Sequence, residues 1–317
     1  MIQVSSSTAR RWRAARMQSR SQIITITRKE AAMAHVTEQT ITEAVIRSFD
    51  QSTNERFRFL ISLLVNHLHE FARETSLTHD EWRVGLEFLT RASRFTDAQR
   101  NEFVLTSDVL GLSSLVDLLN SSPGATEGSV LGPFHAQSSP MVPVGVNLIK
   151  DNEGDPVLLR GRVLDLEGRP INGAMLDFWQ TAANGLYPAQ DPNQHPDNLR
   201  CRMRTGDDGK YAMKVIRPSA YTVPYDGPVG DLLRAGGRHA WRPAHFHFIV
   251  GAPGFRSVVT ELFNEDDSYI EQDAAFGVRD SIVVKFKRND SSEDAASHGV
   301  RSPFYVVDFD FRLERDL

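Results

Sequence analysis

Cysteine is almost absent from this chain of 317 residues. Cys201 is the only one, so neither an intrachain disulfide nor a cluster of thiolate metal ligands can form. Any tightly bound metal ion must therefore be held by histidine, carboxylate or tyrosine oxygen.

Long apolar runs and an excess of basic charge are absent too. The longest apolar stretches are much shorter than the run of about 20 residues that a membrane helix needs, so we expect no membrane insertion. The net charge of −5 argues against a nucleic-acid partner, because phosphate contacts need a concentrated basic face. The charged content of 24% is ordinary for a cytosolic enzyme, and we expect a cytoplasmic location.

The start of the chain differs from the rest. Residues 1–32 contain no acidic residue before Glu30, and their basic residues are Arg10, Arg11, Arg13, Arg16, Arg20, Arg28 and Lys29. An arginine- and serine-rich, acid-poor start is typical of an organelle transit peptide. The alternatives are a disordered tail or a true start at Met33. No sustained amphipathic pattern accompanies the arginines, so we expect residues 1–32 to be a disordered extension.

Residues 33–120 have a helical period. Apolar residues between Phe57 and Phe71 recur at intervals of three and four, which predicts one apolar stripe on a long helix. Three pairs have the spacing of a helix-capping box: Thr40 with Glu43, Thr78 with Glu81, and Thr96 with Gln99. A few such helices enclose their own core poorly, so their stripes should pack on the other half of the chain or on a second subunit.

Residues 121–140 form a linker, and residues 141–317 have a period of two. Alternating side chains occur in 174–179, 211–215 and 304–312, and turn residues separate such segments. The expected fold is therefore mainly β: an antiparallel β-sandwich that follows an N-terminal α-helical domain. The stretch 289–298 is polar and is expected to be a surface loop.

The segment from Arg242 to Val250 carries the strongest chemical signal. On a strand, His245 and His247 point to one face and lie about 7 Å apart, close enough to share a metal ion. A lone histidine on an apolar strand is more often a core residue. Two at this spacing favour a site, although the pattern alone fits zinc hydrolases and iron(II) cupins equally well.

The remaining ligands decide between metals. A 2-His-1-carboxylate iron(II) site would need an acid, and Glu261 is a candidate donor. The same region offers Tyr187 and Tyr221 in turn-rich settings. Phenolate is a hard anionic donor that suits a trivalent ion such as iron(III). Physical reasoning does not rank the six tyrosines, most of which are better explained by core packing.

Three runs of residues resemble the intradiol ring-cleavage dioxygenases. They are 128–134 (GSVLGPF), 221–230 (YTVPYDGPVG) and 237–248 (GRHAWRPAHFHF). The resemblance covers most of the chain from about Val36 to Phe309. It implies a β-sandwich catalytic domain, an N-terminal helical domain that forms a homodimer, and iron(III) bound by Tyr187, Tyr221, His245 and His247. Whether lipid occupies the helical interface, as it does in some relatives, is left open.

The resemblance also implies roles for individual residues. Tyr221 would leave the iron and act as a base for the diol. Arg242 would stabilise negative charge on the ring, the alternative being a surface salt bridge. The residues expected to line the substrate pocket are Leu105, Asp108, Val130, Leu131, Gly132, Val223, Pro224, Arg242 and Ala275. Glu261 departs from the catechol-cleaving branch, where a neutral glutamine is usual.

The stretch 223–230 (VPYDGPVG) resembles the hydroxyquinol-cleaving branch of the family more than the catechol-cleaving one. The substrate that this resemblance implies is hydroxyquinol (1,2,4-trihydroxybenzene), opened to 3-hydroxy-cis,cis-muconate or maleylacetate. Asp108 would accept a hydrogen bond from the third hydroxyl, unless it is a helix-surface residue without a role. The first alternative is a catechol or chlorocatechol 1,2-dioxygenase that forms cis,cis-muconate. The second is a β-sandwich binding module without catalysis, which would be colourless where an iron(III)–tyrosinate enzyme is red.

Overall fold

The computed structural model describes residues 35–97 and 100–316. Contacts divide the chain into two units, Met1–Leu89 and Thr90–Leu317. The extension expected at 1–32 lies outside the described residues. Within the described residues, no helix is both long and apolar enough to cross a membrane.

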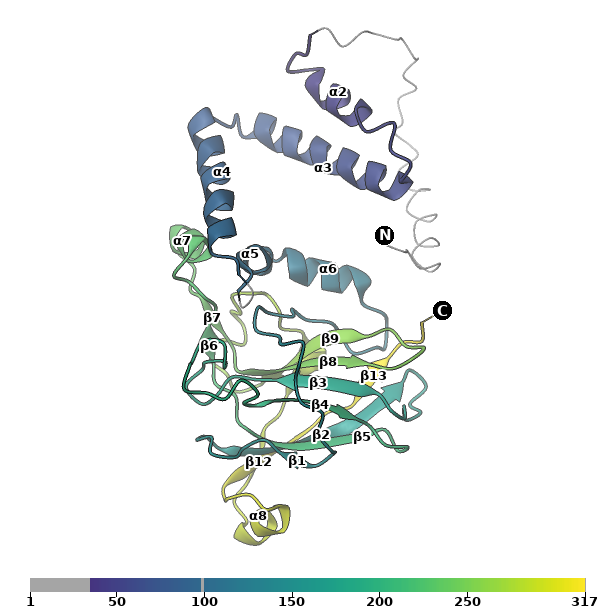
Figure 1. Ribbon diagram of the computed structural model, residues 1–317, viewed down its shortest axis with the longest axis vertical. Helices are drawn as coiled ribbons and strands as arrows, with labels where there is room; N and C mark the ends of the chain where they lie inside the picture. Colours follow the sequence, from purple (N-terminus) through teal and green to yellow (C-terminus); the bar gives the residue numbers. More distant parts are fainter. Residues whose placement is uncertain (1–34, 98–99, 317) are drawn as a thin grey trace. The chain divides into compact units, whose positions relative to one another are not determined.

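The first unit is helical (Figure 1). It contains α2 (Ile41–Arg47), α3 (Glu55–Glu74) and the start of α4 (His79–Arg94). The expected stripe lies on α3, where Val65 is the buried residue. In the isolated chain Leu64, Leu68 and Phe71 are 53%, 56% and 55% exposed. Such an apolar surface is typical of an interaction face.

The structure confirms one of the three predicted helix-capping boxes and contradicts another. The box at Thr78 is confirmed, because the amide of Thr78 donates to Glu81 Oε2 at 2.9 Å and the amide of Glu81 donates to Thr78 Oγ1 at 3.3 Å. The box at Thr40 is wrong, since its side chain makes no capping hydrogen bond to α2. The third expected box includes Gln99, which lies outside the described residues.

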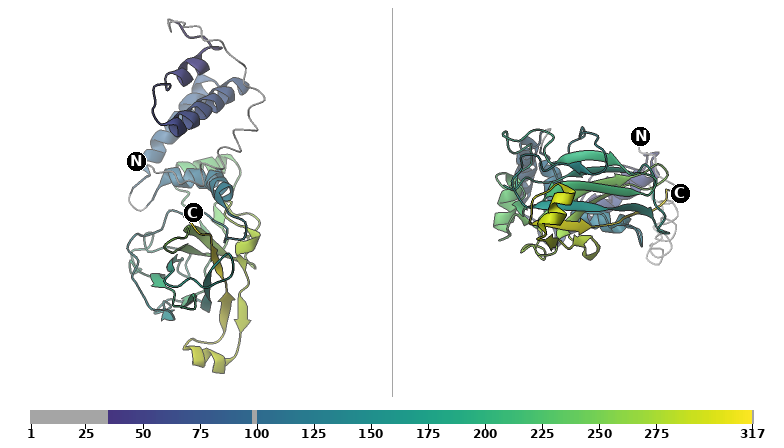
Figure 2. Two further views of the ribbon diagram at one scale, coloured as in Figure 1. Left: turned by 90° about the vertical axis from the view of Figure 1, so that its right-hand side faces the viewer. Right: turned by 90° about the horizontal axis from the view of Figure 1, so that it is seen from below.

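The second unit contains further helices around two sheets. The helices are α5 (Glu102–Val109), α6 (Leu112–Asn120), α7 (Pro228–Ala235) and α8 (Ser292–His298). Helix α8 corrects the loop expected at 289–298. Its Ala295 packs with Leu158 of β2 and Phe304 of β12. The helix is the short yellow one that lies beyond the strands at the bottom of the left-hand view in Figure 2.

The larger sheet has the strand order β1-β5-β2-β12-β11, with β13 also paired to β2. The second sheet has the order β10-β9-β8-β3-β4, and β6 pairs with β7. The strands are β1 (Val146–Asn147), β2 (Pro156–Asp165), β3 (Met175–Trp179), β4 (Arg200–Arg204), β5 (Lys210–Ile216), β6 (Tyr221–Thr222), β7 (Trp241–Arg242), β8 (His245–Gly251), β9 (Val258–Asn264), β10 (Val283–Val284), β11 (Lys287–Asn289), β12 (Phe304–Asp308) and β13 (Phe311–Leu313).

The two sheets form two layers around one apolar core (Figure 1). Phe248 of β8 lies 4.8 Å, between ring centroids, from Phe311 of β13 and 6.2 Å from Tyr211 of β5. The expected antiparallel arrangement holds only in part. The pairs β2–β5, β3–β8 and β8–β9 are antiparallel, whereas β12 and β13 pair parallel to β2. An alternating sequence fixes which face a side chain takes, but it does not fix the direction of the neighbouring strand.

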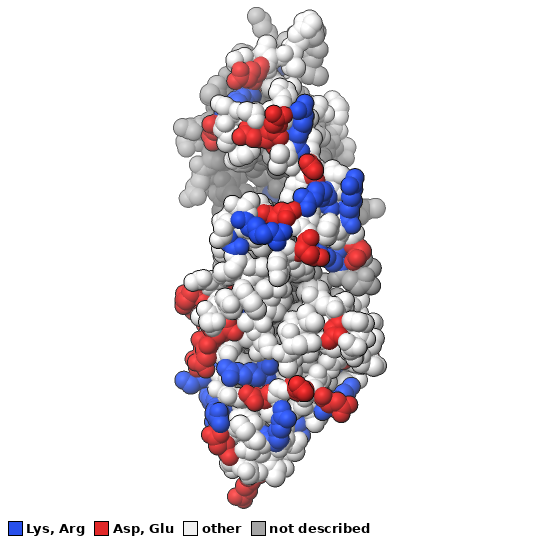
Figure 3. Space-filling model, turned by 90° about the vertical axis from the view of Figure 1, so that its left-hand side faces the viewer, with Lys and Arg blue, Asp and Glu red and all other residues white. Residues whose placement is uncertain are grey.

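Charged side chains of both signs lie on the surface of the described residues. On the face shown in Figure 3, lysine and arginine side chains are interspersed with aspartate and glutamate. Some of them form pairs, as Arg91 does with Asp231. Exposed pairs of this kind contribute little to stability.

Candidate metal centre

Two histidines of β8 turn their rings toward one point. His245 and His247 share one face of the strand because side chains alternate, while Phe246 and Phe248 enter the apolar core on the other face. The two Nε2 atoms lie 3.1 Å apart, and both side chains are almost fully buried. The shared face of His245 and His247 that the sequence predicts is confirmed.

The protonation of the two rings favours metal binding. His245 Nδ1 lies 2.6 Å from the carbonyl oxygen of Pro243. A carbonyl only accepts, so Nδ1 carries the proton and Nε2 keeps its lone pair. Burial lowers the pKa of His245, and burial together with His245 and Arg242 holds the pKa of His247 well below its usual range. Both rings are therefore neutral near pH 7.

Two tyrosines complete the group of donors. Tyr187 follows β3, and its hydroxyl oxygen lies 3.0 Å from His247 Nε2. Tyr221 lies on β6, with its ring centroid 5.4 Å from that of Tyr187 and 5.3 Å from that of His245. Burial raises the pKa of both phenols, well above the usual value for Tyr187. In the protein alone both keep their protons, and a strong cation would be needed to ionise them.

The spacing of these donor atoms fits a metal ion. Two ligand atoms each about 2.1 Å from an ion and at right angles are about 3 Å apart. His247 Nε2 lies 3.1 Å from His245 Nε2 and 3.0 Å from the Tyr187 hydroxyl oxygen, as such a pair of ligand atoms would. The carboxylate of Glu261 lies beside the two histidines, and the ligand atoms of the three residues are all within 4.8 Å of one another, a spacing that a metal ion could also bridge.

The backbone and an indole ring hold His247 in place. The indole of Trp179 stacks on its imidazole with ring centroids 4.8 Å apart and an angle of 6°. Gly132 lies against the same ring, where a Cβ atom would be 3.3 Å from His247 Cε1. Its φ of +69° also favours glycine.

Arg242 lies beneath the donors and is paired with two carboxylates. Nη1 and Nη2 donate to Glu261 at 2.6 and 2.9 Å, and Nε and Nη2 donate to Asp273, each at 2.9 Å. Arg242 is 2% exposed, so the alternative of a surface salt bridge is wrong. One guanidinium shared by two carboxylates leaves this buried group with a net negative charge. Burial raises the pKa of Glu261 and Asp273, but Arg242 and the other hydrogen-bond donors together outweigh burial, so the pKa of each carboxyl is lowered.

Comparison with known proteins identifies the family. The family model described as "Dioxygenase" matches residues 131–315, and "Catechol dioxygenase N terminus" matches residues 54–128. The hydroxyquinol 1,2-dioxygenase of Rhizobium sp. (strain MTP-10005) is 41% identical over 88% of this chain and 96% of its own length. The intradiol ring-cleavage dioxygenase hqdA of Aspergillus niger is 40% identical over 90% and 87%.

A solved structure agrees with these matches. Hydroxyquinol 1,2-dioxygenase from Pseudomonas putida DLL-E4 superposes with a TM-score of 0.80 at 44% identity, covering 88% of this chain and 99% of that one. The chain belongs to the intradiol ring-cleavage dioxygenases. The resemblance inferred from its motifs is confirmed. As a member of this family, which depends on non-haem iron, the protein is an oxidoreductase that acts on an aromatic diol with dioxygen.

Three residues expected to contact substrate interact either with a donor of this dioxygenase or with Arg242 and its partners. Asp108 is 3% exposed and lies in the electrostatic field of Arg242. Gly132 touches His247, as described. The amide of Ala275 donates to Asp273 Oδ1 at 3.1 Å, which places it beside the partner of Arg242. The alternative of Asp108 as a helix-surface residue is wrong, because its side chain is buried.

For the other expected pocket residues, the structure shows a cleft lining or a degree of burial. Val223 and Pro224 line a cleft of about 780 Å³ together with Phe134, whose ring stacks on Tyr187 at 4.6 Å. Leu105 and Val130 are each 1% exposed, whereas Leu131 is 40% exposed.

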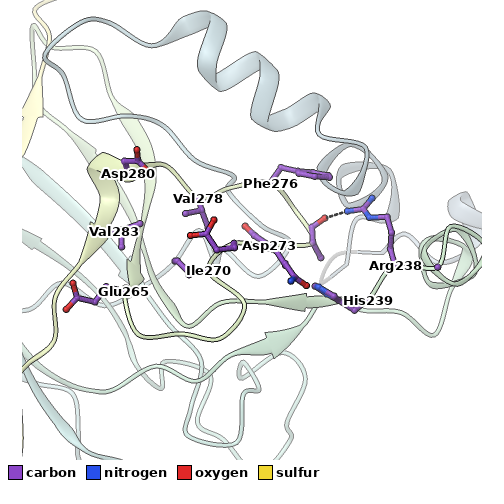
Figure 4. Close-up of a pocket in the computed structure, with 13 residues that line it drawn as sticks. Arg238, His239, Glu265, Ile270, Asp273, Phe276, Val278, Asp280 and Val283 are labelled. Carbon is purple, nitrogen blue, oxygen red and sulfur yellow. Dashed lines mark hydrogen bonds between the residues drawn. The ribbon is translucent and has the colours of Figure 1, made fainter.

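A second cleft, of about 880 Å³, is lined by Asp273 among other residues (Figure 4). Phe276 and Arg238 border it, and Arg238 Nη2 donates to the carbonyl oxygen of Ala274 at 2.9 Å. Asp273 lines this cleft and also binds Arg242.

The sequence reasoning missed several neighbours of the donors. Ser129 lies within a run that carries the family resemblance, and Trp179 ends a segment that was expected to be a strand, so both had a weak signal. Asp273 and Gly277 belong to a loop without a motif. Only the tertiary fold brings these two residues next to Arg242.

Proposed function

We propose that this dioxygenase opens hydroxyquinol between its two adjacent hydroxyl-bearing carbons. The observation that carries the proposal is the convergence of the donors of Tyr187, His245 and His247 within one buried group. The buried carboxylate of Asp108 interacts electrostatically with Arg242 and with Glu261, which contacts both imidazoles. The similarity to two proteins named hydroxyquinol 1,2-dioxygenase supports this substrate. The ring bond breaks, and each of its carbons becomes a carboxyl carbon that takes one atom of dioxygen.

The proposed cofactor is iron(III), and its proposed ligands are Tyr187, Tyr221, His245 and His247. Bound there, iron(III) would lower the pKa of the substrate hydroxyls and draw electron density from the ring. The donor set of neutral imidazoles and phenols supports a hard trivalent ion, because such an ion offsets the raised pKa of both buried phenols.

The chain's own residues would move protons and stabilise charge. The Tyr221 oxygen would accept a proton from one substrate hydroxyl. Tyr221 is the cross-strand partner of Arg242 in the β6–β7 pair, which keeps base and cation together. Arg242 Nη1 lies 3.4 Å from His245 Nε2 and would stabilise negative charge that develops on the ring.

The substrate would lie among the pocket residues named above. Asp108 would accept a hydrogen bond from the third hydroxyl, the feature that separates hydroxyquinol from catechol. Its burial supports this role, because burial raises the pKa of the Asp108 carboxyl and the hydroxyl of Ser113 offsets only part of that effect. A substrate hydroxyl would supply a further hydrogen-bond donor.

The test is turnover by the purified protein on hydroxyquinol and on catechol, with iron content and the visible spectrum measured on the same sample. We expect a red protein that consumes one dioxygen per hydroxyquinol and incorporates both atoms of labelled dioxygen into the product. Faster turnover of catechol or chlorocatechol would assign it to the alternative substrate class. A colourless protein without iron and without turnover would instead support the binding module.

We also propose that the enzyme is a cytoplasmic homodimer joined through the apolar stripe of α3, an interface where lipid could also be held. The exposure of Leu64 and Leu68 supports an interface there. We expect light scattering to give twice the chain mass. Leu64→Glu combined with Leu68→Glu should give monomers, whereas Glu70→Lys on the same helix, outside the stripe, should not. A monomeric unaltered protein at micromolar concentration would contradict the proposal, and lipid extraction of the dimer followed by mass spectrometry tests for bound lipid.

A further inference from the structure

Glu261 is a buried carboxylate in the metal centre that the proposed ligand set leaves without a role. It lies on β9, directly opposite His247 in the antiparallel pair β8–β9, so the two side chains share one face of the sheet. Its side chain is 0% exposed. A charged group at such a position requires partners that offset its desolvation.

Both oxygens of Glu261 are already held by hydrogen bonds. Arg242 donates to Oε1 and Oε2, and the hydroxyl of Ser129 donates to Oε2 while Ser129 Oγ also lies 2.8 Å from the carbonyl oxygen of Gly277. These donors hold the carboxylate in one orientation. They also compete with a metal ion for its lone pairs, so Glu261 is better suited to orient a ligand than to be one.

The remaining contacts of Glu261 are with the imidazoles. Oε1 lies 3.3 Å from His247 Nδ1 and 3.3 Å from His245 Nε2. The Nδ1 atom of His247 is buried, and its 3.3 Å contact is not aligned as a hydrogen bond. His245 differs, because its Nδ1 is bound to the carbonyl oxygen of Pro243.

The two rings therefore depend on different partners. If Nε2 of His247 gives its lone pair to a metal ion, Nδ1 carries the proton and needs an acceptor. Oε1 of Glu261 is the acceptor that the fold supplies, and a small rotation of the ring would align the bond. A carboxylate bound to the distal nitrogen of a metal-bound imidazole fixes its tautomer and raises its basicity.

We propose that Glu261 is a positioning residue that holds the ring of His247 toward the metal, with Ser129 and Arg242 holding Glu261 in turn. This inference rests on the proposed iron site. It assigns Glu261 a role separate from that of a simple counterion for Arg242.

Asp273 provides a matched control for that distinction. It pairs with the same guanidinium through two hydrogen bonds of 2.9 Å, as Glu261 does at 2.6 and 2.9 Å. Among the described residues, Asp273 makes no ion pair or hydrogen bond with either imidazole. Neutralising Asp273 therefore removes a partner of Arg242 and leaves the contacts of His247 intact.

The experiment compares Glu261→Gln with Asp273→Asn in the iron-loaded protein. The readouts are the rate at which a chelator removes iron, the visible absorption band, and the melting temperature of each iron-free protein. We expect both variants to melt lower than the unaltered protein. Iron loss should be roughly tenfold to hundredfold faster in Glu261→Gln, with a shifted band, and close to the unaltered rate in Asp273→Asn.

Three results would overturn the inference. Equal acceleration in both variants would mean that Glu261 acts only through Arg242. An unchanged rate and band in Glu261→Gln would remove any role toward His247. Complete loss of iron from Glu261→Gln, matching Tyr187→Phe, would make Glu261 a ligand. If Glu261→Gln does not fold, Ser129→Ala replaces it: faster iron loss supports the inference and an unchanged rate overturns it. An unaltered protein that binds no iron would instead refute the proposed function.

Discussion

Arg242 and Glu261 form a two-pronged ion pair in which Nη1 lies 2.6 Å from Oε1 and Nη2 lies 2.9 Å from Oε2. Glu261 belongs to β9, the neighbour of the strand that carries both histidines, and Arg242 lies on β7 three residues before His245. The pair thus links the guanidinium of Arg242 to the sheet that carries His245 and His247. The atoms packed around the ion pair leave its side chains little room to move.

Gly277 is the residue that leaves room for this ion pair. A Cβ atom at Gly277 would lie 2.7 Å from Arg242 Nη2 and 2.8 Å from both Glu261 Oε2 and Ser129 Oγ. Gly277→Ala should therefore displace the pair without removing any polar group. Overpacking of this kind costs about 1–3 kcal/mol, and we expect a lower melting temperature together with faster iron loss. Gly206→Ala is the control, because its nearest neighbour would be 3.8 Å away. Equal behaviour of the two variants would contradict the prediction.

Removing single hydroxyls tests the proposed tyrosine ligands. Tyr187→Phe should lose most of the iron or of the visible colour, because it removes one of four protein donors. His247→Ala, which removes an imidazole donor instead of a hydroxyl, should lose iron or colour to a similar degree. Tyr221→Phe should keep more iron but change colour and turn over more slowly, since this phenolate is proposed to leave when substrate binds. Tyr211→Phe is the control: it is a buried core tyrosine whose hydroxyl donates to the carbonyl oxygen of Phe309 at 2.8 Å. Full iron and activity in Tyr187→Phe would show the ligand assignment to be wrong.

Substrate choice is expected to depend on Asp108. Asp108→Ala should lower kcat/KM for hydroxyquinol far more than for catechol. A buried hydrogen bond to a charged group contributes roughly 1.5–3 kcal/mol, or about tenfold to hundredfold in the ratio of the two substrates. Asp108→Asn should fall in between, because an amide oxygen still accepts a hydrogen bond. Equal losses on both substrates would indicate a folding role for Asp108.

The stability of the second unit should depend on the ionisation of Asp117. Burial raises the pKa of its carboxyl to about 6, and Arg279 offsets only part of the effect. A raised folded-state pKa means that ionisation disfavours folding, so the penalty grows as pH rises from about 4 to about 6 and is complete above that.

Asp117→Asn should therefore raise the melting temperature at pH 8 and raise it less at pH 5. With the half-exposed side chain taken into account, we expect about 1 kcal/mol, or about 2–4 °C, at pH 8. Thermal unfolding followed by circular dichroism at both pH values measures the difference. A variant that is stabilised equally at pH 5 and pH 8 would rule out the carboxyl's ionisation as the cause.

The sequence by itself determined the parts of this protein that depend on local periodicity. A period of two on β8 put His245 and His247 on one face and the phenylalanines on the other, because side chains of a strand alternate. Intervals of three and four placed the apolar stripe on α3. The motif order then indicated the family, and Tyr187 and Tyr221 could be singled out from the other tyrosines only through that resemblance.

Tertiary structure decided the electrostatics of the site and the direction of several strands. Asp273 lies 31 residues after Arg242 along the chain. No local sequence pattern predicts that its carboxylate pairs with the guanidinium. The parallel pairing of β12 with β2 joins residues about 150 positions apart, Tyr305 with Val157 among them. Alternation and capping act within a few residues, whereas charge pairing and strand order depend on which distant segments the folded core brings together.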